Sequence, residues 1–153
     1  MLRVAPARPF PGCAGVSVFL LVLSLSGCKD SVRLRDEKLD IGSDTIQLAP
    51  GVSVHDVQVR THADGEFEPA NIKVRTGDVI RFKTTDARTH VLSFDETTLP
   101  PQVRDHLVSH AQLRSPPLLV EGAVWIVSLA DVPHGEYSIH CQTHGVAGRI
   151  TVE

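Results

Sequence analysis

Cysteine is scarce in this chain of 153 residues, which contains only Cys13, Cys28 and Cys141. Three thiols so far apart do not make the paired framework that holds small secreted domains together, so a disulfide-rich fold is excluded. Methionine is scarcer still, because Met1 is the only one. The interior of the chain therefore has no thioether to offer to a metal ion.

A strong excess of positive charge is also missing. Lys and Arg number 15 against 18 Asp and Glu, for a net charge of −3. Loss of residues 1–27, which include Arg3 and Arg8 but no acidic residue, would leave 13 basic residues and a net charge of −5. Binding of nucleic acid needs a basic patch and is disfavoured. The remaining length is enough for one domain.

The N-terminal residues 1–27 have the pattern of a signal peptide rather than of a folded element. Two arginines precede the apolar run Val16–Leu25, which is too short for a membrane span of about 20 residues. The run ends in Leu-Ser-Gly-Cys28, which resembles the bacterial lipobox. We expect a lipoprotein anchored through Cys28 on the periplasmic side of a membrane; the alternative is an ordinary secretory signal. The pattern leaves inner and outer membrane open.

Residues 28–49 are polar and charged, with sparse apolar residues and no clear period. This composition predicts a tether between the membrane and the domain that follows. A short helix within the tether is the alternative.

Residues 50–153 are dominated by short segments with the alternation of β-strands, separated by turn residues such as Thr76-Gly77. This pattern predicts an all-β sandwich. The alternation changes phase near His55 and Asp56, which indicates a bulge. Residues 124–129 are almost continuously apolar, as in a strand buried on both faces or in a sandwich core. The expected core residues are Phe67, Phe82, Phe94, Trp125 and Ile139.

One segment, Pro100–Ala111, predicts a short helix, because Val103 and Leu107 follow a proline start at helical spacing. His106 and His110 are four residues apart on this helix and could share a metal ion. No third ligand accompanies them, so a solvated helix face is favoured.

The stretch that carries chemistry is Tyr137–His144, in which Cys141 and His144 are three residues apart. A thiolate with an imidazole favours a borderline or soft metal. A structural zinc site would need a second cysteine nearby, and there is none. His90 is the best candidate for a third ligand. Two histidines and one cysteine form the blue-copper electron-transfer set.

Three ordered segments resemble the cupredoxins, the family of plastocyanin, amicyanin and azurin. They are residues 66–82, which resemble the family's Phe-x-Pro and Val-x-x-Gly-Asp-x-Val-x-Phe pattern, the segment 90–95, and residues 135–144 followed by 148–152. The resemblance implies a Greek-key β-sandwich and one type 1 copper ion held by His90, Cys141 and His144. It also implies single-electron transfer to redox partners, with no enzyme activity.

The chain departs from the family at the axial position, where a methionine normally follows the second histidine. Depending on the loop alignment, the axial neighbour is Val146 or Ala147; plastocyanin-like spacing gives Arg149, which is unsuited because it does not deprotonate. Without a thioether donor, we expect Cu(I) to be favoured and the potential to be raised. Val91 also replaces an asparagine that often braces the ligand loop, which predicts a less rigid site.

Alternation along residues 137–142 places Cys141 inward and His140 outward. His140 is then an electron-entry surface or a plain exposed histidine, and the sequence does not separate the two. Tyr137 matches the tyrosine corner of Greek-key sandwiches. Three further histidines are expected at the surface without a site: His55, His62 and His134.

Three functions remain open. The favoured one is a membrane-anchored, monomeric electron carrier whose donor and acceptor the sequence does not name. The second is a copper-binding or copper-delivery protein without redox traffic. The third is an interaction module that has lost its metal, which the joint presence of His90, Cys141 and His144 disfavours.

Overall fold

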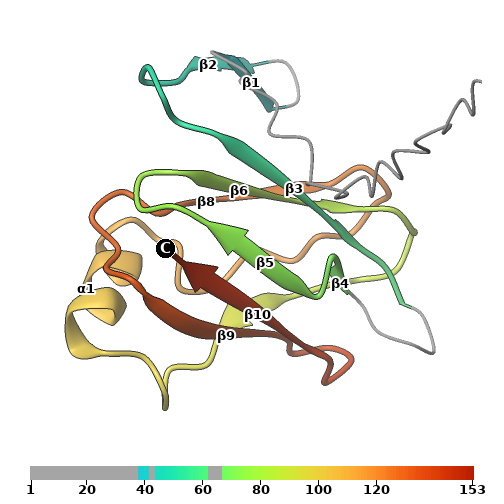
Figure 1. The fold of residues 1–153 in the computed structure, drawn as a ribbon. Coiled ribbons are helices and arrows are strands. Elements are labelled where there is room, and N and C mark those ends of the chain that lie inside the picture. The colour runs from blue at the N-terminus through green and yellow to red at the C-terminus, as the bar shows by residue number, and fades with distance from the viewer. Residues whose placement is uncertain (1–37, 42–43, 62–66) are drawn as a thin grey trace, which may run out of the picture.

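Two four-stranded sheets packed face to face form the body of the protein (Figure 1). The structure, a computed structural model, describes residues 38–41, 44–61 and 67–153. One sheet has the order β4-β3-β6-β8 and the other the order β5-β10-β9-β7. The first sheet consists of β3 (Val54–Val59), β4 (Phe67–Glu68), β6 (Val79–Thr84) and β8 (Val124–Ser128). The second consists of β5 (Asn71–Val74), β7 (Leu92–Phe94), β9 (Gly135–Cys141) and β10 (Ala147–Val152).

The strand pairing is mixed: β3 runs parallel to β6 and β5 parallel to β10, while the other pairs in the two sheets are antiparallel. Consecutive strands therefore cross between the sheets instead of forming a simple meander. This arrangement confirms the predicted Greek-key β-sandwich with one short helix between strands.

The core lies between the two sheets, where the alternating residues of each strand meet. Phe67, Phe82, Phe94, Trp125 and Ile139 are all at most 6% exposed, which confirms the expected core. Phe82 stacks on Trp125 with ring centroids 5.4 Å apart, and Phe94 meets the same indole edge-on at 6.3 Å. Tyr137 is also buried, and its hydroxyl donates to the carbonyl of Pro133 at 2.8 Å, as predicted for a tyrosine corner.

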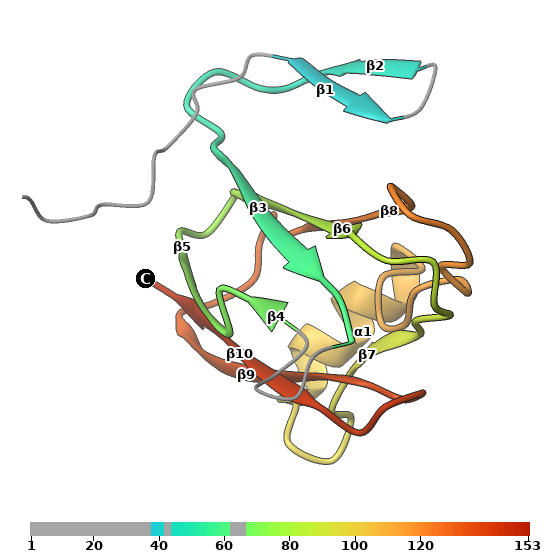
Figure 2. The ribbon, with the colours of Figure 1, turned by 90° about the vertical axis from the view of Figure 1, so that its right-hand side faces the viewer.

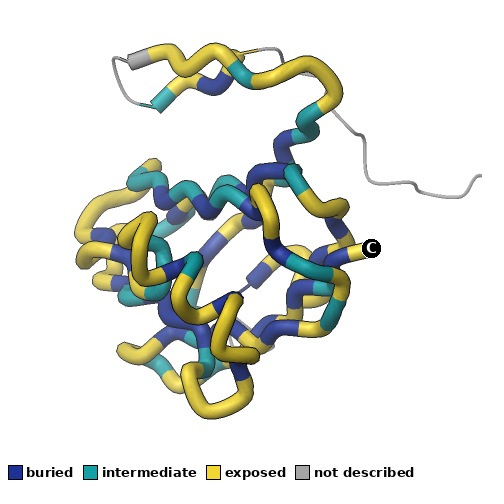
Figure 3. The backbone as a smooth tube through the Cα atoms, turned by 90° about the vertical axis from the view of Figure 1, so that its left-hand side faces the viewer, coloured by how far each residue is buried: buried dark blue, intermediate teal, exposed yellow. Residues whose placement is uncertain are grey.

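The segment expected to be an irregular tether contains a β-hairpin, which corrects that prediction for residues 38–47. Strands β1 (Lys38–Ile41) and β2 (Asp44–Gln47) pair antiparallel, and no described residue of this segment is helical. The hairpin lies over the outer side of the β3-β6-β8 sheet (Figures 2 and 3). Leu39 is 2% exposed and belongs to a second apolar cluster with Val54 and Val79.

This cluster explains the change of phase in β3, where the predicted bulge is wrong. The parallel register of β3 on β6 is continuous from Val54 to Val59. Val54 faces the hairpin, whereas Val57 and Val59 belong to the main core. Both faces of the sheet are apolar at this point because each face is covered. Ile126 of β8 packs against the same hairpin cluster, which accounts for the continuous apolar run there.

Helix α1 (Pro101–Ser109) lies in the connection between β7 and β8 and buries Val103 and Leu107, as predicted (Figure 2). Within the described residues, no helix has the length and apolar character that a membrane crossing requires. The predicted signal peptide, the lipidation site Cys28 and His62 fall outside the described residues.

Candidate metal centre

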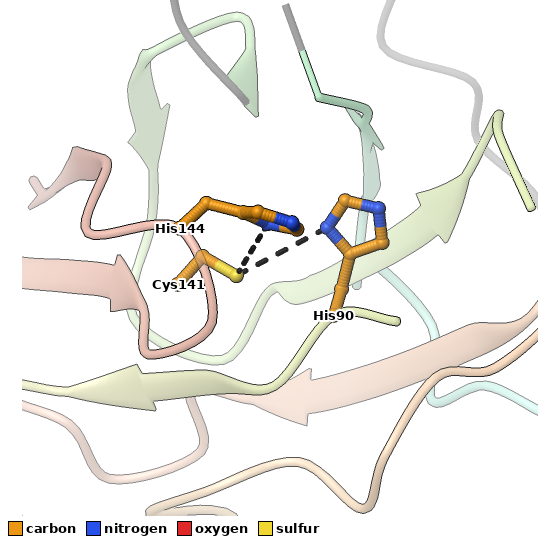
Figure 4. A group of neighbouring side chains, drawn as sticks. All are labelled: His90, Cys141 and His144. Atoms are coloured by element: carbon orange, nitrogen blue, oxygen red, sulfur yellow. Dashed lines mark hydrogen bonds between the residues drawn. The ribbon is translucent and has the colours of Figure 1, made fainter. Parts of the chain in front are cut away.

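His90, Cys141 and His144 come together at one end of the sandwich, as predicted (Figure 4). Their donor atoms all lie within 4.8 Å of one another. The sulfur of Cys141 is 3.6 Å from Nδ1 of His144 and 4.0 Å from Nδ1 of His90. Cys141 and His90 are fully buried, whereas His144 is partly exposed. The two imidazoles thus converge on one thiol from different segments.

A tight loop after β9 places His144 over Cys141. The backbone N–H of Gly145 donates to the carbonyl of Cys141 at 2.8 Å, and the N–H of Cys141 donates to the carbonyl of Val146 at 2.8 Å. Gly145 has a φ of 74°, a conformation that glycine adopts without the strain of a side chain. The chain can therefore reverse within four residues and return into β10.

His90 is placed by a backbone bridge rather than by a strand. It exchanges two hydrogen bonds with Leu118, of 3.0 and 2.9 Å. The next residue, Val91, accepts a 2.8 Å hydrogen bond at its carbonyl from the N–H of Gln142 in the ligand loop. The sequence predicted a less rigid site because Val91 offers no side-chain amide. The backbone of Val91 contacts the loop directly through this bond, and the lower rigidity stays a prediction.

Asp86, which the sequence pattern did not single out, contacts the buried ring of His90 through its carboxylate. Asp86 Oδ1 lies 2.8 Å from Nε2 of His90, and Oδ2 accepts from the N–H of Thr61 at 2.7 Å. Partial burial alone would raise the pKa of Asp86. The hydrogen bonds from Thr61, His90 and the N–H of Arg88 outweigh this effect and lower the pKa to about 2. An acidic residue four positions before a predicted ligand histidine was the available signal.

The donor set fits a metal ion bound by three ligands. Imidazole nitrogen and thiolate sulfur bind such ions at about 2.0 to 2.3 Å, so three donors in a trigonal plane lie about 3.5 to 4 Å apart. The two distances from the Cys141 sulfur, 3.6 and 4.0 Å, match this spacing. The carboxylate of Asp86 can only accept, so Nε2 of His90 carries the hydrogen and Nδ1 keeps its lone pair for the metal.

The part of the chain that contains the three candidate ligands matches a known protein family. A cupredoxin-like domain matches residues 50–152. The chain belongs to the cupredoxin-like family. Cupredoxins are typically electron-transfer proteins rather than enzymes, and those related to this chain bind copper.

Individual relatives are plastocyanins. The chloroplastic plastocyanin of Chlamydomonas reinhardtii is 26% identical over 152 residues, which cover 97% of this chain and 85% of that protein. Plastocyanin of Nostoc punctiforme is 29% identical over 115 residues, or 69% of this chain and 80% of that protein.

Solved structures show the same fold. A mutant plastocyanin of a fern superposes with a TM-score of 0.53 at 22% identity, over 64% of this chain and 99% of that one. The oxidized form of an amicyanin mutant gives a TM-score of 0.50 at 19% identity, over 69% and 86% of the two chains. At these identities the likeness concerns the fold alone.

The structure separates the two axial candidates of this cupredoxin. Ala147 pairs with His140 in the β9–β10 ladder, so the next opposed pair is Val146 with Cys141. Directly opposed residues of antiparallel strands point to the same face. Val146, which is half-buried, therefore shares the inward face of Cys141, whereas Ala147 is exposed on the face of His140.

The other predicted histidines lie outside the cluster. His140 is half-buried on the face opposite Cys141, as the alternation predicted. His106 and His110 lie with ring centroids 4.3 Å apart and ring planes tilted by 34°, and the only group of three potential ligands among the described residues is the one at Cys141. His134 is exposed as predicted. His55 is not a plain surface residue, because its Nε2 pairs with Asp78 at 2.9 Å and its side chain is 13% exposed.

Proposed function

We propose that this cupredoxin is a type 1 copper protein that carries single electrons, with copper bound by His90, Cys141 and His144. The observation that carries the proposal is the convergence of two Nδ1 atoms on one fully buried thiol. A copper ion in such a set supplies one-electron chemistry between Cu(I) and Cu(II), because thiolate and imidazole accept both states.

The protein side of this function is to keep the ligands fixed and dry. His90 and Cys141 are inaccessible to water, and the backbone bonds of the ligand loop limit rearrangement when the charge of the site changes. Val146 offers no donor atom on the inward face. We therefore expect a potential above that of Met-ligated relatives; a value well below theirs would contradict this part of the proposal.

A partner can approach where His144 is partly exposed. The adjacent loop, joined to His90 through Leu118, presents Leu119 and Val120 at 60% and 61% exposure. Exposed apolar residues at the edge of a redox site suit short-lived contact with a redox protein. His140, on the other side of Cys141, is the second candidate for electron entry.

We further propose that the protein acts as a monomer on the periplasmic side of a bacterial membrane, held by lipid on Cys28. The support is the lipobox-like sequence after a short apolar run. Incorporation of labelled palmitate that persists in Cys28→Ser would contradict the anchor.

The test of the copper site is a visible spectrum of residues 29–153 after addition of Cu(II). An intense thiolate-to-copper band is expected, and it should be lost in Cys141→Ser and in His144→Ala. His134→Ala, a substitution of an exposed histidine outside the cluster, is the matched control and should keep the band. A colourless protein without bound copper would overturn the proposal, and an interaction module without a metal would be the remaining function.

Copper delivery is the second candidate function. It is favoured by the absence of a thioether donor on Val146 and by the partial exposure of His144, both of which would ease release of the ion. A colourless protein that holds Cu(I) tightly and passes it to a chelator within seconds would support delivery. Reversible reduction and oxidation with the copper retained supports electron transfer.

A further inference from the structure

Two aspartates make the same kind of contact at the two ends of β6. Asp78 precedes the strand and accepts hydrogen bonds from the N–H groups of Ser53 and Arg75, both at 3.0 Å, and from Nε2 of His55 at 2.9 Å. Asp86 follows the strand and accepts from the N–H groups of Thr61 and Arg88 and from Nε2 of His90. Each carboxylate therefore joins one end of β3 to one end of β6 and holds one imidazole.

Only the second of these imidazoles belongs to the metal centre. The ring of His90 is 0% exposed, so water cannot replace Asp86 as the partner of Nε2. A carboxylate accepts and never donates, so the hydrogen of the neutral ring resides on Nε2. Nδ1, which faces the sulfur of Cys141 at 4.0 Å, is then the ring nitrogen that carries the lone pair. The contact thus selects the tautomer that a metal ligand requires.

We propose that Asp86 is a positioning residue of the metal centre, which fixes the tautomer and orientation of His90 from the end of β6. This inference rests on the proposed copper site, and it adds a residue outside the ligand set. The carboxylate is itself held in place, because its Oδ2 accepts the 2.7 Å hydrogen bond from Thr61, which directly follows Arg60 after β3.

A negative charge behind a ligand histidine also acts on the metal. A carboxylate hydrogen-bonded to the distal nitrogen makes the imidazole a stronger donor. A stronger donor stabilises the more highly charged Cu(II) more than Cu(I). Asp86 should therefore raise the affinity for both states, and for Cu(II) more, which lowers the potential relative to the same site without the charge.

Asp86→Asn removes this function with a small change of shape. The three donors around residue 86 would meet one amide oxygen and one NH₂ group in place of two acceptors. An NH₂ group that faces Nε2 of His90 forces that nitrogen to accept, which moves the ring hydrogen to Nδ1. In the other orientation the amide oxygen faces Nε2 of His90, and the NH₂ group then faces the N–H of Thr61, so that two donors meet without an acceptor. Asp78→Asn makes the same change around His55 and is the matched control.

The first measurement uses the metal-free full chain in detergent micelles, labelled with ¹⁵N in histidine. We expect His90 in the Nε2–H form in the wild type and in Asp78→Asn, and a shift toward the Nδ1–H form in Asp86→Asn. Asp86→Ala removes the acceptor whatever the amide orientation, so an unchanged His90 tautomer in both Asp86→Asn and Asp86→Ala would overturn the proposal. This result does not depend on copper, so it separates the role of Asp86 from the copper function.

The second measurement is the dissociation constant of the same full-length variants for Cu(II) and Cu(I). Asp86→Asn should weaken binding about 10- to 100-fold, more for Cu(II), with a shifted visible spectrum. For each factor of ten by which the loss of Cu(II) affinity exceeds the loss of Cu(I) affinity, the potential rises by about 59 mV. Asp86→Glu, which keeps the charge, should recover part of the affinity.

Equal effects of Asp86→Asn and Asp78→Asn on affinity, spectrum and potential would reduce Asp86 to a purely structural residue and overturn the proposal. A wild type that binds no copper would instead overturn the proposed function.

Discussion

Val146 lies directly opposite Cys141 where the ligand loop enters β10, joined to it by a 2.8 Å hydrogen bond from the Cys141 N–H to the Val146 carbonyl. The pair shares the inward face of the sheet, because the neighbouring pair His140 and Ala147 shares the outward face. The side chain nearest to the family's axial position is therefore apolar, and the thiol has no thioether as its neighbour.

A methionine at this place should create the missing donor. We expect Val146→Met to lower the potential of the copper-loaded protein, because a thioether donor stabilises Cu(II) relative to Cu(I), whereas an apolar side chain at this place does not. Cyclic voltammetry checks this. Ala147→Met is the matched control, since residue 147 points outward with His140, and it should leave the potential unchanged. A shift only in Ala147→Met would show that the loop register differs from the one described.

The apolar loop beside His90 should matter for electron exchange. Leu119→Lys places a charge on a side chain that is 60% exposed next to Leu118, the backbone partner of His90. Loss of about 1.4 kcal/mol of contact would slow electron self-exchange about tenfold, which NMR line broadening in mixtures of Cu(I) and Cu(II) protein measures. Val108→Lys, the same change at a 54% exposed position on α1, is the control. Equal rates in both variants would exclude this surface.

Acid stability of the metal-free protein should depend on Asp78. Burial alone would raise the pKa of Asp78, but hydrogen bonds from the N–H groups of Arg75 and Ser53 and from His55 lower it below its ordinary value. A depressed carboxyl pKa stabilises the fold above the unfolded pKa of about 3.9, and this stability is lost as the pH falls through the folded pKa.

Asp78→Asn should therefore lower the free energy of unfolding at pH 7 by about 1.5 to 3 kcal/mol, with the difference from wild type shrinking below about pH 4. Urea unfolding at pH 7, 5 and 3 measures this. The exposed helix residue Asp105 provides the control, since Asp105→Asn should stay within about 0.5 kcal/mol. A gap between wild type and Asp78→Asn that stays constant down to pH 3 would contradict the assignment.

The hairpin should be held to the sandwich by Leu39. Leu39→Ala removes a 2% exposed side chain from the cluster with Val54 and Val79, and we expect a local loss of about 2 kcal/mol. Hydrogen exchange of the β1 and β2 amides should then accelerate before that of β9. Ile46, the cross-strand partner of Leu39, is 48% exposed, so Ile46→Ala should have little effect. Equal acceleration by both variants would mean that the hairpin is held by its own pairing alone.

The sequence by itself determined which donor atoms the candidate metal centre contains. The spacing of Cys141 and His144, together with His90 in a segment that resembles the family, limited the metal set, because the types of donor atom are fixed by the residues. The five core residues and helix α1 were also predictable, since burial follows from alternation and helical spacing along one short segment.

Only the tertiary structure decided which side chains share a face or an environment. The choice of Val146 over Ala147 depends on strand register, which shifts every side chain to the other face when it moves by one residue. The roles of Leu39 and Asp86 depend on partners 15 and 25 residues away, Val54 and Thr61. Local sequence patterns carry no record of such pairings, because long-range contacts form only when separate segments pack together.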